Sequence, residues 1–302
     1  MKLIAIFLAL GAERLATQLF HFRELKWLHR LIGAMLEWPR HVSFVPATLA
    51  VLTLLALLIA PLLWVRFTSS EALHGLPYLA FSVVVLFLCL GPQDIGEQVD
   101  AWADAVDRGD DDLATERGRA LLDCDPRPNR TIVDAVFVQG NNRIFSVIFW
   151  FICFGPIGAW AMRMADTLRR RSIVRREDLI AGEDEAAVPQ AEQLVDATER
   201  VHAVMAWIPA RLSALSYALA GSFDRAWDAF SKPDSHEPGD LGEENDRLLI
   251  DVGCAALTFA VDPDNEQNEE VQHAKAAKRL LVRALVVWVV VVAVITIAGP
   301  IV

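Results

Sequence analysis

The chain has 302 residues, a hydrophobic fraction of 54% and a formal net charge of −11 at pH 7. Its mean hydropathy of +0.34 is too high for an ordinary soluble protein and is typical of a membrane protein with sizeable aqueous parts. The acidic balance excludes a nucleic-acid-binding protein, because no basic domain is present to hold phosphates. The four cysteines lie far apart in the sequence, so we expect neither a disulfide framework nor a zinc site.

The first apolar stretch, Leu3–Ala12, is short, and no small-residue cleavage site follows it. We therefore expect a retained helix rather than a signal peptide. Glu13 and Arg14 come directly after this helix. Ionisable side chains at membrane depth are costly and often functional, so both are candidates for a ligand site. In the alternative interpretation the helix ends at the interface and both side chains reach water.

Three later stretches are long enough to span a bilayer, which requires about 20 apolar residues. They lie between Arg40 and Arg66, between Glu71 and Asp94, and after Arg283. Together with the first helix, two of them form the predicted N-terminal membrane segment, residues 1–92.

The orientation follows from the arginine and lysine residues beside these helices, which favour the cytoplasm. Segment 13–42 is rich in these residues, whereas the link 66–75 carries only Arg66. We therefore place segment 13–42 in the cytoplasm as a helical segment and link 66–75 on the outer side.

Segment 93–143 then returns to the cytoplasm. Apolar residues at helical spacing from Ile95 to Val106 are followed by Gly109, and a second helical stretch begins after Asp110. This pattern predicts a cytoplasmic helical hairpin.

Segment 144–221 is more complex, because arginine clusters flank an uncharged run at residues 144–162. A plain crossing would place the cluster at 163–176 outside the cell, against the positive-inside bias. Either the run is re-entrant and bends at Gly155-Pro156, or it crosses and residues 204–221 cross back. The alternative is a plain single crossing that overrides the bias, because long loops translocate with little regard to charge. We predict a broken or re-entrant membrane helix, a linker and an amphipathic helix here, then an acidic soluble segment at 222–279 and a C-terminal membrane helix at 280–302.

The best candidate for a binding site is Asn141-Asn142-Arg143, which heads this apolar run. The free N–H groups of a helix N-terminus attract anions, and an arginine there suits a phosphate or a carboxylate. Arg163, Asp166 and Arg211 are expected on the same side. The alternative is an asparagine N-cap followed by an arginine that reaches lipid headgroups.

Motifs of soluble enzymes are absent: the sequence has no phosphate-binding loop, dinucleotide fingerprint, zinc-protease motif or nucleophile elbow. Glu199 and His202 stand one helical turn apart, but one such pair is a common accident rather than a metal site. The sequence therefore favours a protein without enzymatic activity, and it predicts no catalytic residue, no metal ligand and no cofactor.

Two stretches carry a resemblance to a known family. The stretches "RIFSVIFWFICFGPIGAWAMRM", which begins at Arg143, and "MAWIPARLSALSYALAGSF", which begins at Met205, resemble the paired signatures of the AmpE proteins, part of the wider CobD/CbiB superfamily of inner-membrane proteins. The opening "LIAIFLALGAERL" is similar to the N-terminus of the same family. The resemblance implies an all-α polytopic membrane protein with helical cytoplasmic insertions.

The resemblance implies two classes of function. AmpE proteins are signalling modulators linked to β-lactamase induction and cell-wall recycling, alongside a cytoplasmic amidase. CobD/CbiB proteins are synthases that use ATP and magnesium to attach an aminopropanol unit in cobalamin biosynthesis. This sequence has "VQGNNRIF" and "DTLRRRSIVRR" where synthases carry E-N-x-x-D-G and T-L-D-S-M-x-G-Y. It therefore keeps an asparagine, Asp166, Thr167 and Leu168, but it loses the expected ATP and magnesium ligands.

We therefore predict a multi-pass protein of the bacterial inner membrane with an AmpE-like regulatory role. Its expected partners are the lipid bilayer, an anionic or phosphorylated cell-wall-related ligand and, by function, a cytoplasmic amidase. The predicted ligand-binding residues are Asn141, Asn142, Arg143, Arg163, Asp166, Arg211, Glu13 and Arg14. The alternatives are a synthase of the CobD/CbiB class, the only interpretation that needs ATP or Mg, and a scaffold without a ligand.

Overall fold

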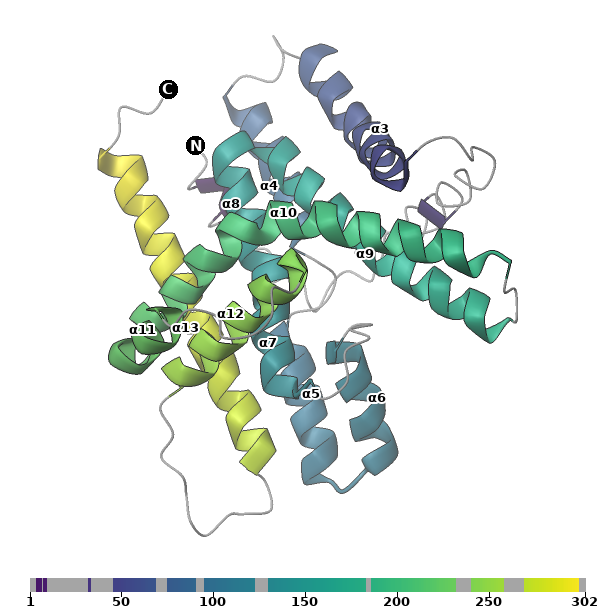
Figure 1. The fold of residues 1–302 in the computed structure, drawn as a ribbon. Helices are drawn as coiled ribbons and strands as arrows, with labels where there is room; N and C mark the ends of the chain where they lie inside the picture. Colours follow the sequence, from purple (N-terminus) through teal and green to yellow (C-terminus); the bar gives the residue numbers. More distant parts are fainter. Residues whose placement is uncertain are drawn as a thin grey trace. The chain divides into compact units, whose positions relative to one another are not determined.

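The computed structural model shows an all-α protein (Figure 1). The part of the chain that it describes contains helices and no strand, which confirms the predicted fold class. The described residues are 4–6, 8–9, 32–33, 46–68, 75–90, 95–122, 130–182, 186–231, 240–257 and 269–298.

The chain forms two compact units, each built from two separate parts of the sequence. One unit comprises Met1–Pro92 and Ser146–Met205, and the other comprises Gln93–Phe145 and Ala206–Val302. The helix α10 (Val188–Ala220) contributes to both units.

In the first unit the long helix α9 is the central element. It packs against α3, α4 and α8. The indole of Trp160 on α9 donates a hydrogen bond of 3.0 Å to the carbonyl of Leu58 on α3. The bounds of these helices are α3 (Ala47–Thr68), α4 (Leu76–Cys89), α8 (Ser146–Phe154) and α9 (Pro156–Ala181).

The predicted bend at Gly155-Pro156 separates α8 from α9. Gly155 has φ of 67° and ψ of −153°, a conformation that is essentially restricted to glycine. Pro156 then begins α9, where its missing N–H costs nothing. The two helices fold back against each other and form a tight helical hairpin (Figure 1).

In the second unit the helix α7 is central and packs against α5, α6, α12 and α13. Its core is aromatic: the ring centroids of Phe137 and Tyr217 are 5.1 Å apart, and those of Phe145 and Trp288 are 5.4 Å apart. The bounds are α5 (Ile95–Asp107), α6 (Asp111–Leu122), α7 (Ile132–Gly140), the π-helix η3 (Asn141–Phe145), α11 (Phe223–Ser231), α12 (Leu241–Ala256) and α13 (Glu269–Ala298).

Helices α5 and α6 form a hairpin, as their apolar spacing predicts (Figure 1). Gly109 supplies the positive φ of 70° that the turn requires. Asp110 caps α6 by accepting a hydrogen bond of 3.1 Å from the backbone N–H of Leu113.

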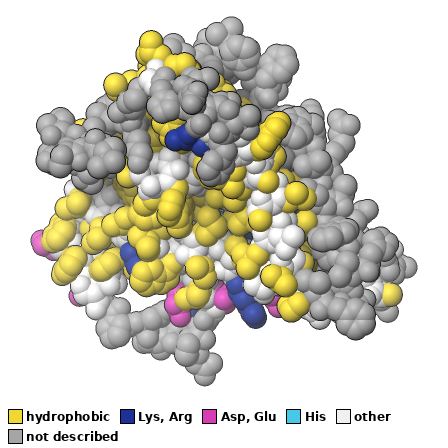
Figure 2. Space-filling view, turned by 90° about the horizontal axis from the view of Figure 1, so that it is seen from above, with side chains coloured by type: hydrophobic (Ala, Val, Ile, Leu, Met, Phe, Trp, Pro, Cys, Tyr) yellow, Lys and Arg dark blue, Asp and Glu magenta, His cyan; other side chains and the backbone are white. Residues whose placement is uncertain are grey.

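Three of the described helices are long and apolar enough to cross a membrane, namely Ala47–Arg66, Ile132–Phe154 and Val188–Ala220. The second begins at Ile132 and not, as the charge pattern suggested, at Ile144. In the stretch between Glu71 and Asp94, the described helix covers only Leu76–Cys89 and is shorter than a full span. Figure 2 shows a face on which hydrophobic side chains predominate, with isolated charged side chains among them.

Candidate functional site

The residues Asn141, Asn142 and Arg143 lie inside a continuous helix and not at its start. Helices α7, η3 and α8 follow one another without a break from Ile132 to Phe154. The backbone N–H of Asn141 bonds to the carbonyls of Phe137 and Val138. The expected helix N-terminus with free N–H groups is therefore wrong at this position.

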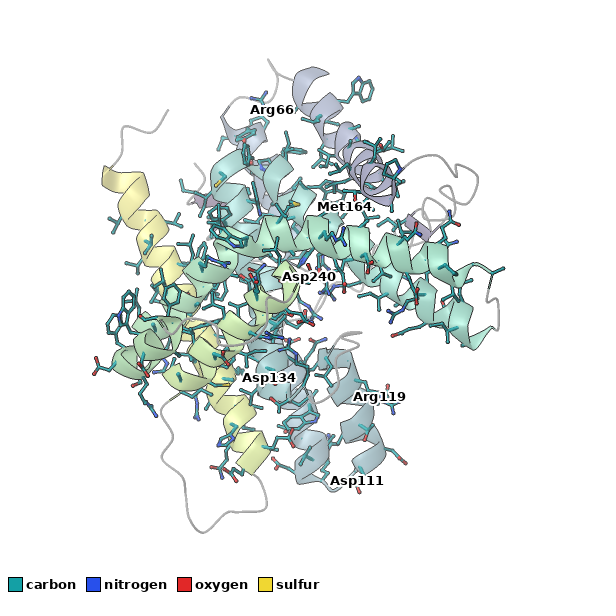
Figure 3. The ribbon with its side chains drawn as sticks, viewed as in Figure 1. Arg66, Asp111, Arg119, Asp134, Met164 and Asp240 are labelled. Carbon is teal, nitrogen blue, oxygen red and sulfur yellow. The ribbon has the colours of Figure 1, made fainter. Side chains whose placement is uncertain are left out.

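The true start of this helix is marked by Thr131 and Asp134. The Thr131 hydroxyl accepts from the Asp134 N–H at 3.2 Å, and the Asp134 carboxylate accepts from the Thr131 N–H at 2.9 Å. This reciprocal capping box satisfies two N–H groups at the beginning of α7. Asp134 lies near this end of α7 in Figure 3.

The side chains of the π-helix form a buried polar cluster instead. Asn141, Asn142 and Arg143 are 1%, 5% and 7% exposed. Arg143 donates from Nε to Gln139 Oε1 and from a terminal nitrogen to Gln98 Oε1, each at 3.0 Å. Short π-helical segments are frequent at functional sites, because the altered ladder re-aims side chains.

Asn141 connects this cluster to α10. Its Oδ1 accepts a hydrogen bond of 3.0 Å from Ser213, and its Nδ2 donates to Asn142 Oδ1 at 3.2 Å. Beside it, the buried hydroxyl of Tyr217 donates to the Phe137 carbonyl at 3.2 Å. The polar layer is thus built into the helix packing of the second unit.

Arg211 does not join Asn141 to Arg143 in the contacts that the structure shows. One of its terminal nitrogens donates to the carbonyl of Trp207 and to Asn245 Oδ1, both at 2.9 Å. Its guanidinium lies 4.0 Å from the centroid of the Trp207 ring, within cation–π range.

A second polar cluster surrounds Asp166 in the first unit. The Asp166 side chain is 1% exposed, and its two carboxylate oxygens face three arginines of the same helix and one histidine of α10. The nearest nitrogens lie 3.4 Å away for Arg163, 3.5 Å for Arg169, 2.9 Å for Arg170 and 3.7 Å for His202. We call these five residues the Asp166 cluster.

The spacing along α9 explains this arrangement. Positions three and four residues apart lie on one helix face, so Arg163, Asp166, Arg169 and Arg170 are neighbours. Helix α10 packs beside this face, where Ser172 Oγ lies 2.7 Å from Thr198 Oγ1. This packing brings His202 to the carboxylate.

In the Asp166 cluster, Nε of Arg169 and Nε2 of His202 are buried without a hydrogen-bond partner among the described residues. Arg170 Nε is close to Asp166 Oδ2, but at an angle that makes the contact an ion pair rather than a hydrogen bond. Burial lowers the pKa of Arg170 to about 10, so its guanidinium still carries a charge at neutral pH.

The predicted site residues therefore fall into two groups. Arg163 and Asp166 meet in the first unit, whereas Asn141, Asn142 and Arg143 form their cluster in the second unit. Glu13 and Arg14 lie outside the described residues. The sequence analysis did not select the amide partners Gln98 and Gln139 or, around Asp166, the residues Arg169, Arg170 and His202. The spacing of the arginine run on one face of α9 carried a signal for Arg169 and Arg170 only.

The comparisons with known proteins identify the family of the chain. The family described as "Regulatory signalling modulator protein AmpE" matches residues 1–302. A cobalamin biosynthesis protein CobD of Chromobacterium violaceum is 29% identical over 182 residues, which cover 57% of this chain and 53% of that protein. A CobD protein of Stutzerimonas stutzeri is 30% identical over 160 residues, which cover 51% of this chain and 48% of that protein.

The chain thus spans about half the length of the curated relatives that it matches. No solved structure matches the chain. The family match extends over the whole sequence, and the relatives lie in the superfamily that the resemblance indicated. The chain belongs to the AmpE family of regulatory signalling modulators.

Proposed function

We propose that this protein is a regulatory modulator of the bacterial inner membrane, linked to β-lactamase induction and peptidoglycan recycling, that responds to an anionic cell-wall-related ligand bound at its cytoplasmic side. Its membership of the AmpE family supports the regulatory role. The Asp166 cluster is the observation that supports the ligand class.

The hydrogen-bond donors of the Asp166 cluster favour an anionic ligand. A guanidinium has five N–H donors, whereas a carboxylate offers about four lone-pair sites. Nε of Arg169 and Nε2 of His202 are buried without a hydrogen-bond partner in the described part of the chain. An unsatisfied buried polar group costs about 1–3 kcal/mol. A phosphate or carboxylate bound here would satisfy both nitrogens and would be oriented by charged donors.

The polar cluster around Arg143 supports a role beyond membrane anchoring. It lies in a helix that is long and apolar enough to cross a membrane. Polar and ionisable side chains at such positions are costly and usually serve a function.

The similarity to CobD proteins favours one alternative, an enzyme of the ATP- and magnesium-dependent synthase class. The described residues do not fit that chemistry. They contain no group of three or more His, Cys, Asp or Glu side chains that would hold a metal ion. Asp166 faces guanidinium groups, which occupy the oxygens that a magnesium ion would need. We therefore derive no reaction step through ATP or magnesium.

The test is ligand binding by the purified full chain, measured by calorimetry with inorganic phosphate and with a muramyl peptide as probes. Arg169→Gln removes one charged donor, worth about 1.5–3 kcal/mol, so affinity should fall by about tenfold or more. The same variant should reduce β-lactamase induction in cells challenged with a β-lactam.

The matched control is Arg119→Gln, an exposed arginine that points away from α5 in Figure 3. This variant should bind and signal as the wild type does. Unchanged binding and induction in Arg169→Gln, or failure of the wild type to bind either probe, would contradict the proposal. Restored growth of a strain lacking the cobalamin synthase would instead support the alternative.

A further inference from the structure

Helix α11 carries an aromatic ladder whose first two rings are largely uncovered by the described residues. Phe223, Trp227 and Phe230 stand at helical positions i, i+4 and i+7. Their rings stack, with centroids 5.7 Å apart and planes 13° apart for the first pair and 5.8 Å and 17° for the second. Phe223 and Trp227 are nevertheless both 47% exposed.

The packing of α11 against α12 determines which side of α11 faces the protein. Arg225 donates to the Ser222 hydroxyl at 3.1 Å and to the Leu257 carbonyl at 2.8 Å. The Ser222 N–H bonds to the Ala256 carbonyl at 2.9 Å, and Ala226 is fully buried. The side of α11 that faces the protein is therefore the Ala226 side, and the aromatic rings lie on an outer flank.

The corner before α11 is equally tight. A Cβ atom on Gly221 would approach the carbonyl oxygen of Ala256 to 2.3 Å. Only glycine permits this close approach between the end of α10 and the end of α12. The direction in which the aromatic ladder points is thus set by backbone packing.

The position of α11 along the chain indicates what covers the ladder. Helix α10 is long and apolar enough to cross a membrane, and it ends at Ala220. Tyr217, one turn before this end, and Leu281 of α13 both lie beside Gly140. The end of α10 is therefore level with the last charged residue of α13, Arg283, after which the helix is uncharged.

Beyond Arg283 the outer surface of α13 is apolar. Val286, Val290 and Val294 follow one another at four-residue spacing and are 57%, 54% and 58% exposed. Such a stripe suits lipid chains, whereas the charged residues mark the start of the aqueous side. Helix α11 follows α10 at this same boundary, and it carries Asp224 and Asp228 beside its aromatic flank.

We propose that α11 is an interfacial anchor: it lies in the plane of the membrane surface, with Phe223, Trp227 and Phe230 inserted at the boundary between lipid headgroups and acyl chains. Tryptophan is enriched at this depth, because its ring is apolar and its N–H is polar. Phenylalanine accompanies tryptophan on the apolar face of interfacial helices. A short amphipathic helix with charges on one face and aromatic residues on the other binds in this way. The anchor holds the α10–α11 corner, and through it α12, at a fixed distance from the bilayer.

The test uses the full chain in phosphatidylcholine vesicles whose acyl chains carry bromine either near the headgroup or near the chain end. The Trp227 signal is the difference between the tryptophan emission of the wild type and that of Trp227→Phe. We expect shallow bromine to quench this difference signal at least about twofold more strongly than deep bromine. The control is Trp102→Phe, because Trp102 is only 5% exposed inside the second unit and its difference signal should respond to neither lipid.

Two results would overturn the proposal. In the first, an aqueous quencher such as iodide reduces the Trp227 signal while neither brominated lipid does. In the second, the signal depends on the protein-to-lipid ratio and not on bromine, which would mean that a second copy covers the ladder. Phe223→Ser provides an independent check, since it should weaken the shallow quenching of Trp227 while circular dichroism shows the helices intact.

Discussion

At the scale of single residues, Asp166 is a buried acid surrounded by basic side chains. Its carboxylate is buried and faces three guanidiniums and an imidazole. The three guanidiniums offset the cost of burying its charge. Arg169 and Arg170 in turn lie close to its two oxygens, at 3.5 Å and 2.9 Å.

Asp166→Asn should therefore destabilise the protein by about 3–5 kcal/mol, because removal of one partner leaves buried charge uncompensated. The measurement is thermal unfolding of the purified chain in detergent. Asp111→Asn at the exposed start of α6 serves as the control and should change stability little. A melting temperature equal to that of the wild type would show that the arginines are held by other groups.

At the scale of elements, close helix contacts rather than side-chain pairs determine how α8 and α9 meet. A Cβ atom on Gly158 would lie 2.2 Å from the backbone carbonyl of Trp150 and 2.9 Å from Cβ of Phe154. Backbone atoms cannot move aside as a flexible side chain can. The α8–α9 hairpin therefore requires Gly155 for its positive φ and Gly158 for the close approach of the two helices.

Gly158→Ala should open this hairpin and lower stability by about 1–3 kcal/mol, as overpacking of a tight core does. Gly118→Ala on α6 is the matched control. Its new Cβ would meet neighbours no closer than 3.6 Å, so the substitution should stabilise the helix by about 0.5–1 kcal/mol. Thermal unfolding of both variants gives the comparison, and the same sign of change for both would contradict the packing argument.

The elements also show what the sequence alone can and cannot predict. The α5–α6 hairpin and the bend at Gly155 follow from local signals, namely apolar spacing, an acidic cap and a Gly-Pro pair. The π-helix cannot be predicted from such local signals, because its hydrogen bonds depend on whether the residues before Asn141 are themselves helical. The sequence "TIVD" at Thr131 does contain the capping box that marks the start at Ile132. This signal contradicts the prediction that a helix begins at Asn141.

The Asp166 cluster likewise contains contacts that the sequence predicts and one that it does not. Helical spacing alone places Arg163, Arg169 and Arg170 around Asp166. The contribution of His202 depends on the register in which α9 and α10 pack, and the Ser172–Thr198 contact that sets this register joins residues far apart in the sequence. The predicted convergence of Arg211 with Asn142 also depends on helix packing, and the contacts of Arg211 lie elsewhere.

At the scale of the whole molecule, the remaining prediction concerns orientation in the membrane. The arginines of segment 13–42 and the scarcity of basic residues at 66–75 predict that link 66–75 lies outside and that the α5–α6 hairpin lies inside. Leu76, the first residue of α4, is 78% exposed, and Asp111 is exposed at the start of α6 (Figure 3). These two positions should therefore lie on opposite sides of the membrane.

The orientation can be measured by cysteine labelling in a chain whose four native cysteines are replaced. With a membrane-impermeant maleimide on spheroplasts, Leu76→Cys should react at once, whereas Asp111→Cys should react only after the membrane is permeabilised. The cytoplasmic position predicted for the α5–α6 hairpin and the cytoplasmic ligand site proposed above both depend on this result. Labelling of Asp111→Cys in intact spheroplasts would reverse the orientation, and it would direct the search for an anionic ligand to the periplasm, where cell-wall fragments are released.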